Sequence, residues 1–406
     1  MKHIERTKYL NRLKGLIGTP DIKIITGIRR SGKSLLMRDF MGFLKETRQD
    51  VNIIFIDFVD LDNEELKDYK KLHSYIKANI IEEKENFLFI DEVQMCKNFE
   101  LAINSIHANN SADIYLTGSN AFLLSSDLAT LFTGRFLEIK VFPFSFSEYA
   151  QYFDDKKDRE ELFDSYMING GFAGSYPYKN EIDRVSYIKD VYETIITRDL
   201  IQKYELKDIN VLKHLSEYMM DNISNISSLN RISDILRKNI PTANHVTIGR
   251  YCDLLCRAFI FYEATRYDIR GKKYLETSSK YYLVDTSIRY SILGMRNLDY
   301  GRAYENIVFI ELLRRDYDVY VGKLYEKEVD FVAMKGSEKI YIQVSDDISN
   351  EDTLTREIAP FLQIRDAYPK VLLARTKHPR YTIEGIHVVN IADWLLDNNF
   401  SLVSKI

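Results

Sequence analysis

Residues 22–34 of the chain read IKIITGIRRSGKS, and this stretch decides the fold of the amino-terminal part. It begins with a short apolar run typical of a buried strand and ends in the pattern G-x-x-x-x-G-K-S. The segment after it, 34–45, has the apolar spacing of a helix. Between a strand and a helix, the glycines of such a loop let backbone amides surround an anion, so a phosphate-binding loop is predicted. The residues expected to contact the phosphates of ATP are Gly27, Ile28, Arg29, Arg30, Ser31, Gly32, Lys33, Ser34 and Leu35.

Two pairs of polar residues are expected to carry the chemistry of this site. The Lys33 ammonium would hold the outer phosphates, and the Ser34 hydroxyl would take a position on Mg²⁺. The apolar strand at 87–90 ends in Asp91, expected to hold the magnesium, and Glu92, expected to orient or deprotonate the attacking water. Carboxylates at a strand end are common by themselves. Together with the loop they favour a magnesium-dependent site that hydrolyses ATP.

Three further residues are candidates for sensing the nucleotide. Thr117 and Asn120 follow the apolar strand at 114–117, where a sensor of the γ-phosphate would lie, although ordinary turn residues have the same character. Arg135 is a candidate arginine finger or sensor of nucleotide state, with a plain surface arginine as the alternative. A finger acting on a neighbouring chain would require an oligomer.

Composition limits the classes of protein that remain. The chain has 406 residues, of which 45% are hydrophobic, so several compact domains are expected rather than a disordered chain. A formal net charge of −4 gives no global basic field, and a nucleic-acid surface would have to be a local patch. Three cysteines do not suggest a disulfide framework. The sequence has no apolar stretch of signal or membrane-spanning length, so a cytoplasmic location without membrane contact is expected.

Short apolar strands that alternate with helices predict an α/β fold with a parallel sheet. The segments GIRRSGKS, FLFIDEVQ, LTGSNAFLL, LFTGR and PFSFSEY resemble those of predicted AAA+-superfamily ATPases of bacteria and archaea that carry a carboxy-terminal DUF4143 region. This resemblance covers essentially the whole chain. It implies a P-loop NTPase domain of the ASCE/AAA type, a helical lid, a winged-helix middle and a nuclease-like end. The corresponding ranges are 1–145, 146–205, 206–300 and 301–406.

The last of these ranges resembles the PD-(D/E)xK nuclease fold. Glu305 fits the helix position and Asp330 the strand position of that pattern. On the next strand, however, Gln343 stands where the acid is expected and Ser345 where the lysine is expected. Because phosphodiester cleavage needs carboxylates for Mg²⁺ and usually a lysine, we expect a degenerate nuclease site without efficient cleavage. The alternative is that Glu305 and Asp330 are salt-bridged structural residues.

A basic hairpin follows the three helices predicted between 210 and 265. Its turn at Gly271 resembles the wing of a winged helix, and such a tip can follow a phosphate backbone. The residues expected to contact double-stranded DNA are Arg250, Arg266, Arg270, Lys272 and Lys273. A winged helix that contacts a protein partner is an equal alternative.

The sequence therefore predicts an ATPase switch with ATP and Mg²⁺ as cofactors, in which nucleotide state controls binding to DNA or to a protein. Two alternatives belong to other classes. One is a magnesium-dependent DNA nuclease gated by ATP, and the other is a nucleotide-gated scaffold that does not hydrolyse ATP.

Overall fold

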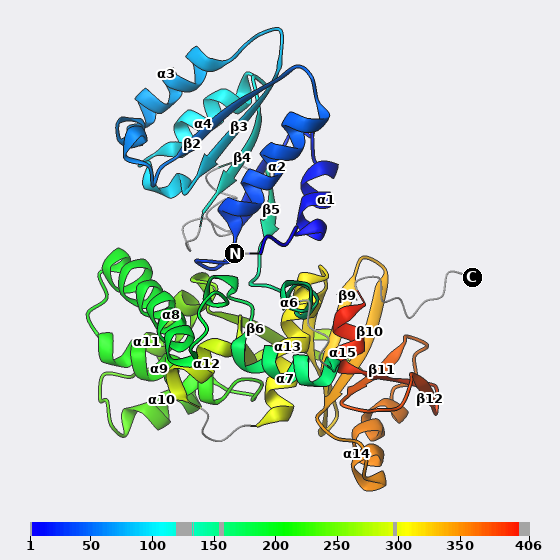
Figure 1. Ribbon diagram of the computed structural model, residues 1–406. Coiled ribbons are helices and arrows are strands. Elements are labelled where there is room, and N and C mark those ends of the chain that lie inside the picture. The colour runs from blue at the N-terminus through cyan, green and yellow to red at the C-terminus, as the bar shows by residue number, and fades with distance from the viewer. Residues whose placement is uncertain (1, 119–131, 133, 154–157, 295–298, 398–406) are drawn as a thin grey trace. The chain divides into compact units, whose positions relative to one another are not determined.

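The computed structural model describes residues 2–118, 132, 134–153, 158–294 and 299–397. The chain forms two compact units (Figure 1). The first unit comprises residues 1–142 with 257–259, and the second comprises 143–256 with 260–406. The boundary expected near residue 145 lies close to this division. The boundaries expected near 205 and 300 fall inside the second unit, where they stay predictions.

The first unit is built on a five-stranded sheet in which every neighbouring pair is parallel. Its strands are β1 (Ile22–Thr26), β2 (Val51–Asp57), β3 (Glu85–Asp91), β4 (Asp113–Thr117) and β5 (Phe136–Lys140), in the order β2-β3-β4-β1-β5. The parallel sheet expected from the sequence is confirmed. One strand, β4, lies between β1, which leads into the glycine loop, and β3, which carries Asp91.

Helices cover both faces of this sheet (Figure 1). They are α1 (Thr7–Gly15), α2 (Lys33–Thr47), α3 (Tyr69–Asn79) and α4 (Phe99–Ala108), with short 3-10 turns η1 (Leu61–Lys67) and η2 (Val93–Met95). Side chains of β3 alternate between two cores, since Phe87 and Phe89 pack with α1 and α2 whereas Leu88 and Ile90 pack with α3 and α4. Burial on both faces explains why the strands read as continuous apolar runs.

The second unit contains a group of helices, of which all but α12 precede its strands in the sequence. They are α6 (Phe146–Phe153), α7 (Arg159–Asn169), η4 (Ala173–Ser175), α8 (Glu181–Thr194), the π-helix η5 (Ile195–Gln202), α9 (Ile209–Asp221), α10 (Leu229–Arg237), α11 (His245–Arg257) and α12 (Thr286–Leu293). Within the described ranges, no helix of either unit is both long and apolar enough to cross a membrane.

An eight-stranded mixed sheet forms the rest of the second unit, in the order β12-β13-β11-β10-β9-β8-β6-β7. The strands are β6 (Phe261–Asp268), β7 (Lys273–Leu283), β8 (Asp318–Leu324), β9 (Lys327–Lys335), β10 (Glu338–Ser345), β11 (Lys370–Ala374), β12 (Tyr381–Ile383) and β13 (Ile386–Asn390). The helices that accompany it are α13 (Tyr300–Arg314), α14 (Glu351–Leu362) and α15 (Ile391–Leu396). On one face Phe309 of α13 packs on Phe331 of β9, and on the other face Ile358 and Phe361 of α14 pack with Val332.

The hairpin that was predicted to be the wing of a winged helix is part of a larger sheet. Strands β6 and β7 pair with each other as expected, but β6 also pairs in parallel with β8, with Arg266 opposite Val321. The hairpin is therefore the outer end of the same sheet that carries the expected nuclease-like strands. Pairing between segments about 55 residues apart leaves no trace in local periodicity, which is why the sequence suggested a boundary at 300. The winged-helix and nuclease-like assignments stay predictions.

Candidate functional site

The glycine loop joins β1 to α2 through backbone conformations that favour glycine. Gly27 has φ +140° and Gly32 has φ +93°, and the loop also holds Arg30 at φ +67°. A Cβ on Gly27 would lie 2.1 Å from the carbonyl oxygen of Val141, so no other residue fits there without displacing backbone. The loop thus has the shape expected of a phosphate cradle at a helix start.

The polar side chains of the loop lie inside it. Lys33 is buried, and its Nζ donates to the carbonyl oxygens of Gly27 at 2.9 Å and Ile28 at 3.0 Å. Ser31 is buried as well, and in the described part of the chain its Oγ has no hydrogen-bond partner. An unpaired buried hydroxyl costs about 1–3 kcal/mol, so its presence beside the cradle indicates a position for a polar ligand.

The expected metal residues meet at the carboxyl end of β3. The Asp91 carboxylate accepts hydrogen bonds from the hydroxyls of Ser34 and Thr117. Burial raises the pKa of Asp91, whereas the two hydroxyls lower it and the neighbouring charges of Glu92 and Asp57 raise it. The loop that begins α2 and the strand that carries the acids are therefore joined side chain to side chain.

Thr117 also fixes the backbone of the second acid. The amide of Glu92 donates to Thr117 Oγ1 at 3.0 Å, and Gln94 Nε2 donates to the Glu92 carboxylate. Glu92 has φ +55°, a left-handed conformation that a non-glycine residue adopts at some cost. Thr117, expected as a sensor, is thus placed between both acids, and its role stays a prediction.

The structure adds Asp57, which the sequence analysis missed. It ends β2 directly opposite Asp91 at the end of β3, and Arg38 Nη2 donates to its Oδ2 at 3.3 Å. A signal was present, because the two strands end in the same letters, IFID at 54–57 and LFID at 88–91. In parallel strands, matching carboxyl ends bring such side chains to one edge of the sheet.

A second missed residue is Arg6, which precedes α1. Its buried guanidinium donates from Nη1 to the carbonyl oxygens of Ser31 and Phe142, both at 2.9 Å, and lies 4.6 Å from the ring centre of Tyr9. Arg6 therefore connects the glycine loop to the last residue of the first unit. Arginines near a chain start are usually exposed, and nothing in the local sequence marks this one.

The other residues expected to contact ATP differ in solvent exposure. Leu35 is 46% exposed and Arg30 is exposed, whereas Arg29 is half-buried. Asn120 lies outside the described residues.

Arg135 lies away from the glycine loop. It precedes β5, and its carbonyl oxygen accepts from the amide of Ile22 at 3.0 Å, at the amino end of β1. The glycine loop begins at the other end of β1, about 16 Å away at roughly 3.3 Å per residue. A nucleotide sensor within its own chain is therefore not supported, because Arg135 lies at the wrong edge of the sheet. A finger acting on a second chain stays a prediction.

The expected nuclease-like residues do come together, around a lysine that the sequence pattern did not include. Lys280 of β7 is buried, with its Nζ 2.9 Å from Glu305 Oε1, 2.5 Å from Glu328 Oε1 and 3.9 Å from Asp330 Oδ1. The positive charge that Ser345 lacks is thus supplied by another strand. In the described chain, no group of three or more His, Cys, Asp or Glu side chains is arranged to hold a metal ion.

Other partners complete this cluster. Tyr282 donates to Glu305 at 2.7 Å, and the amide of Val344 donates to Asp330 Oδ2 at 2.8 Å. Gln343 accepts from the amide of Asp330 at 3.2 Å and donates to Glu357 at 3.1 Å. Burial raises the pKa of Glu305 while Lys280 lowers it, and the net result is a raised pKa.

The expected DNA contacts divide between two elements. Arg250 is exposed on α11, Arg266 is half-buried in β6, and Arg270, Lys272 and Lys273 are exposed at the β6–β7 turn.

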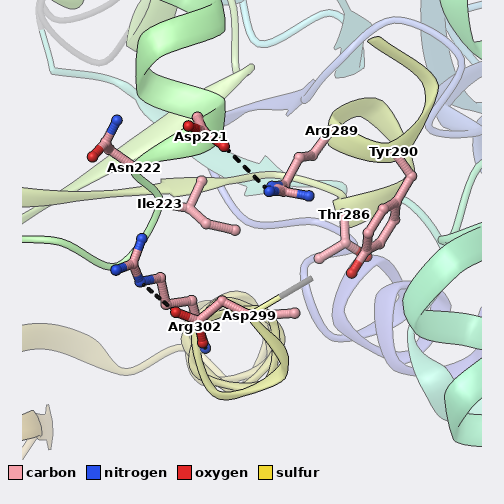
Figure 2. Close-up of a pocket in the computed structure, with 9 residues that line it drawn as sticks. Asp221, Asn222, Ile223, Thr286, Arg289, Tyr290, Asp299 and Arg302 are labelled. Carbon is pink, nitrogen blue, oxygen red and sulfur yellow. Dashed lines mark hydrogen bonds and ion pairs between the residues drawn. The ribbon is translucent and has the colours of Figure 1, made fainter. Parts of the chain in front are cut away.

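A pocket of about 230 Å³ lies elsewhere in the second unit, between α9, α12 and α13 (Figure 2). Both of its arginines already face an acid, with Arg289 3.3 Å from Asp221 and Arg302 2.8 Å from Asp299. Because these charges are balanced within the pocket, it does not favour one class of charged ligand.

Comparison with known proteins agrees with the fold of the first unit. Residues 19–150 match the family AAA_14, described as an AAA domain. Residues 160–299 match DUF8612, a domain of unknown function, rather than the DUF4143 region expected from the resemblance.

Relatives span nearly the whole chain. An uncharacterized protein of Haemophilus influenzae is 37% identical over 399 residues, which are 97% of this chain and 98% of that protein. An uncharacterized protein of Methanocaldococcus jannaschii is 26% identical over 407 residues, 96% of this chain and 89% of that protein. Among solved structures, AMPPCP-bound DnaA from Aquifex aeolicus is 13% identical with a TM-score of 0.31, over 63% of this chain and 87% of that chain.

The parallel sheet and the glycine loop place the first unit in the P-loop class of folds, in agreement with its match to an AAA domain. The chain belongs to the same family as the Haemophilus influenzae protein.

Proposed function

We propose that this protein is a magnesium-dependent ATP-hydrolysing switch that couples nucleotide state to binding of a DNA or protein partner. The observation that carries the proposal is the hydrogen-bonded series Ser34, Asp91, Thr117 and Glu92. It joins the start of helix α2 to the acids at the end of β3 through Thr117 of the neighbouring strand β4. A phosphate-binding loop alone would bind a nucleotide, whereas loop and acids together supply what hydrolysis needs.

The residues present fit ATP and magnesium. Ser31 offers a buried hydroxyl without a partner among the described residues, and the missing side chain of Gly27 lets the loop lie close to the backbone of Val141. Ser34 and Asp91 offer two oxygens beside the loop. Mg²⁺ commonly takes only one or two protein ligands and completes its shell with phosphates and water, so these two residues are sufficient.

Each residue has a defined task in this proposal. Lys33 exchanges its bonds to loop carbonyls for the outer phosphates, and Ser34 and Asp91 hold the metal ion. When bound, Mg²⁺ neutralises charge on the phosphates during transfer to water. Glu92 orients that water and accepts its proton, with its backbone held by Thr117 and its carboxylate by Gln94.

The link to a partner is supported by Arg6. It holds the loop at Ser31 and the chain at Phe142, after which Pro143 begins the second unit. A rearrangement of the loop by nucleotide would therefore act on the segment that leads into the second unit. An arginine finger from a second chain would add regulation by assembly.

The test is phosphate release with saturating ATP and Mg²⁺. The Glu92→Gln variant is expected to lose about 100- to 10,000-fold in turnover while keeping ATP affinity, because only proton transfer is removed. Glu82→Gln, an exposed acid of the same unit, is the matched control and should keep full turnover. Equal turnover in Glu92→Gln and the wild type would contradict the assignment of Glu92. ATP binding without turnover in the wild type would favour the non-hydrolysing scaffold.

The nuclease alternative has one observation in its favour, which is the Lys280 charge beside Glu305 and Asp330. Since both carboxylates already have partners, we expect no cleavage of plasmid DNA with Mg²⁺, with or without ATP. The measurement is conversion of supercoiled to nicked plasmid on a gel. Cleavage that disappears in Asp330→Asn would overturn this expectation and favour the ATP-gated nuclease.

A further inference from the structure

The two faces of the eight-stranded sheet are not covered to the same extent. Helix α14 packs on β9, β10 and β11. The face of the sheet that α14 covers extends beyond this helix over β8, β6 and the edge strand β7. On this part of the face, each of these three strands carries a tyrosine. Tyr267 and the half-buried Tyr320 belong to the apolar core under α14, and Tyr274 is the cross-strand partner of Tyr267.

These three tyrosines form a continuous aromatic surface, here called the tyrosine shelf. Ring centres of Tyr274 lie 5.5 Å from Tyr267 and 5.0 Å from Tyr320, and those of Tyr267 and Tyr320 lie 6.2 Å apart. Tyr267 is 7% exposed, whereas Tyr274 is 60% exposed. The shelf thus has a buried base and an open outer ring. A large exposed aromatic held by two others at a sheet edge offers a flat surface for stacking.

Positive charge gathers at the adjoining end of the sheet. The β6–β7 turn carries Arg270, Lys272 and Lys273, here called the cationic rim, and all three are exposed. None of them forms an ion pair with a side chain that the structure describes. Asp268, an acid of the same turn, accepts from the amides of Arg270 at 3.1 Å and Gly271 at 3.0 Å, so it caps the turn and is not ion-paired with the rim.

The neighbouring β8–β9 turn lies beside this rim. Asp268 at the end of β6 is opposite Lys323 near the end of β8, and the two turns therefore meet at one end of the sheet. The Arg270 guanidinium lies 5.0 Å from the ring centre of Tyr325, which is 52% exposed. This turn thus adds an exposed aromatic residue next to the cations.

We propose that the tyrosine shelf and the cationic rim bind single-stranded nucleic acid. An unpaired base can stack on an exposed aromatic ring such as that of Tyr274. The phosphates on either side of that base are then stabilised by cationic side chains close to the ring. A duplex keeps its bases stacked inside and would leave the shelf unused, and an acidic peptide would use the rim but not the flat ring of Tyr274. The surface lies wholly in the second unit and does not depend on the proposed ATPase activity.

The experiment is fluorescence anisotropy of the full chain with a labelled 12-nucleotide thymidine oligomer and with a 12-base-pair duplex, at 50 and 200 mM salt. We expect tighter binding to the single strand than to the duplex and weaker binding at the higher salt. Tyr274→Ala should weaken single-strand binding about tenfold. Tyr274→Phe should keep it, since the ring remains. The double variant Lys272→Glu, Lys273→Glu should weaken binding and flatten its salt dependence.

Tyr75→Ala, which removes a tyrosine of the first unit that is 40% exposed, is the matched control and should bind as the wild type does. Far-UV circular dichroism checks that each variant is folded, and Tyr274→Phe keeps the test valid if the alanine variant does not fold. Equal affinity for duplex and single strand would overturn the proposal, as would full binding by Tyr274→Ala. Absence of binding to either nucleic acid by the wild type would overturn it as well and leave a protein partner.

Discussion

Gly27→Ala is expected to lower ATP affinity by about 100-fold or more, as measured by titration with a fluorescent ATP analogue. Gly27 has φ +140°, which an L side chain adopts only at a cost, and the added Cβ would lie 2.1 Å from the carbonyl oxygen of Val141. Strain and overpacking together are worth about 3 kcal/mol, and a tenfold change in affinity corresponds to about 1.4 kcal/mol. Relief of the collision requires the loop to move away from Val141, and its amides then no longer surround the phosphates.

Gly42→Ala is the matched control for this variant, because it makes the same chemical change in the helix that follows the loop. A Cβ on Gly42 meets no atom within 4 Å, and its φ is not positive. Alanine inside a helix is more favourable than glycine by up to about 1 kcal/mol, so Gly42→Ala should raise the melting temperature and leave ATP affinity unchanged. Wild-type affinity in Gly27→Ala would mean that the loop does not cradle the phosphates.

Local patterns in the sequence predicted the first unit closely. Strands β3 and β4 begin and end within two residues of the predicted ranges 87–90 and 114–117, because each is a short apolar run bounded by polar or glycine residues. The glycine loop and the acids at 91 and 92 were predicted for the same reason, since each motif is contiguous and ends a strand. Strand order places β4 between β1 and β3, and it thereby brings Thr117 next to Asp91 and Glu92. Local periodicity contains no information about strand order.

Residues that make contacts across long separations in the sequence were missed. Arg6 reaches Phe142 and Lys280 reaches Asp330 through the tertiary fold, and neither has a distinctive local context. The position of Arg135 likewise depends on the tertiary fold, since β5 places it at the amino end of the sheet although it lies near the other motifs in sequence. Site residues could be predicted where one contiguous segment contains them. They could not be predicted where distant segments of the chain each contribute one residue.

Lys280→Met is expected to lower the free energy of unfolding by about 3–5 kcal/mol at pH 8, because it leaves buried carboxylates without their cation. The side chain of Lys280 is 5% exposed, and those of Glu305 and Asp330 are 11% exposed. Urea unfolding followed by fluorescence reports on this unit, since the chain has a single tryptophan, the buried Trp394. Lys327→Met, an exposed lysine of β9, should stay within about 0.5 kcal/mol of the wild type.

The loss in Lys280→Met should shrink as the pH falls toward 5.5. Burial raises the pKa of both Glu305 and Asp330, and the Lys280 charge opposes that rise, so its removal raises both pKa values further. A carboxyl group whose folded pKa lies above its unfolded pKa binds more protons when folded, and stability then falls as the pH rises through that interval. The pKa of Lys280 itself is lowered by burial but raised by a larger amount by Glu305, Asp330 and Glu328, so in the wild type its charge is constant from pH 5.5 to 8.

The double variant Lys280→Met, Glu305→Gln separates charge from packing. It removes one of the uncompensated carboxylates while keeping the size of both side chains, so it should recover part of the stability lost at pH 8. Its stability should also depend less on pH than that of Lys280→Met, because fewer protons are taken up on folding. A loss in Lys280→Met that is equal at pH 5.5 and 8, with no recovery in the double variant, would mean that Lys280 stabilises the sheet by packing and not as the counter-charge of the acids.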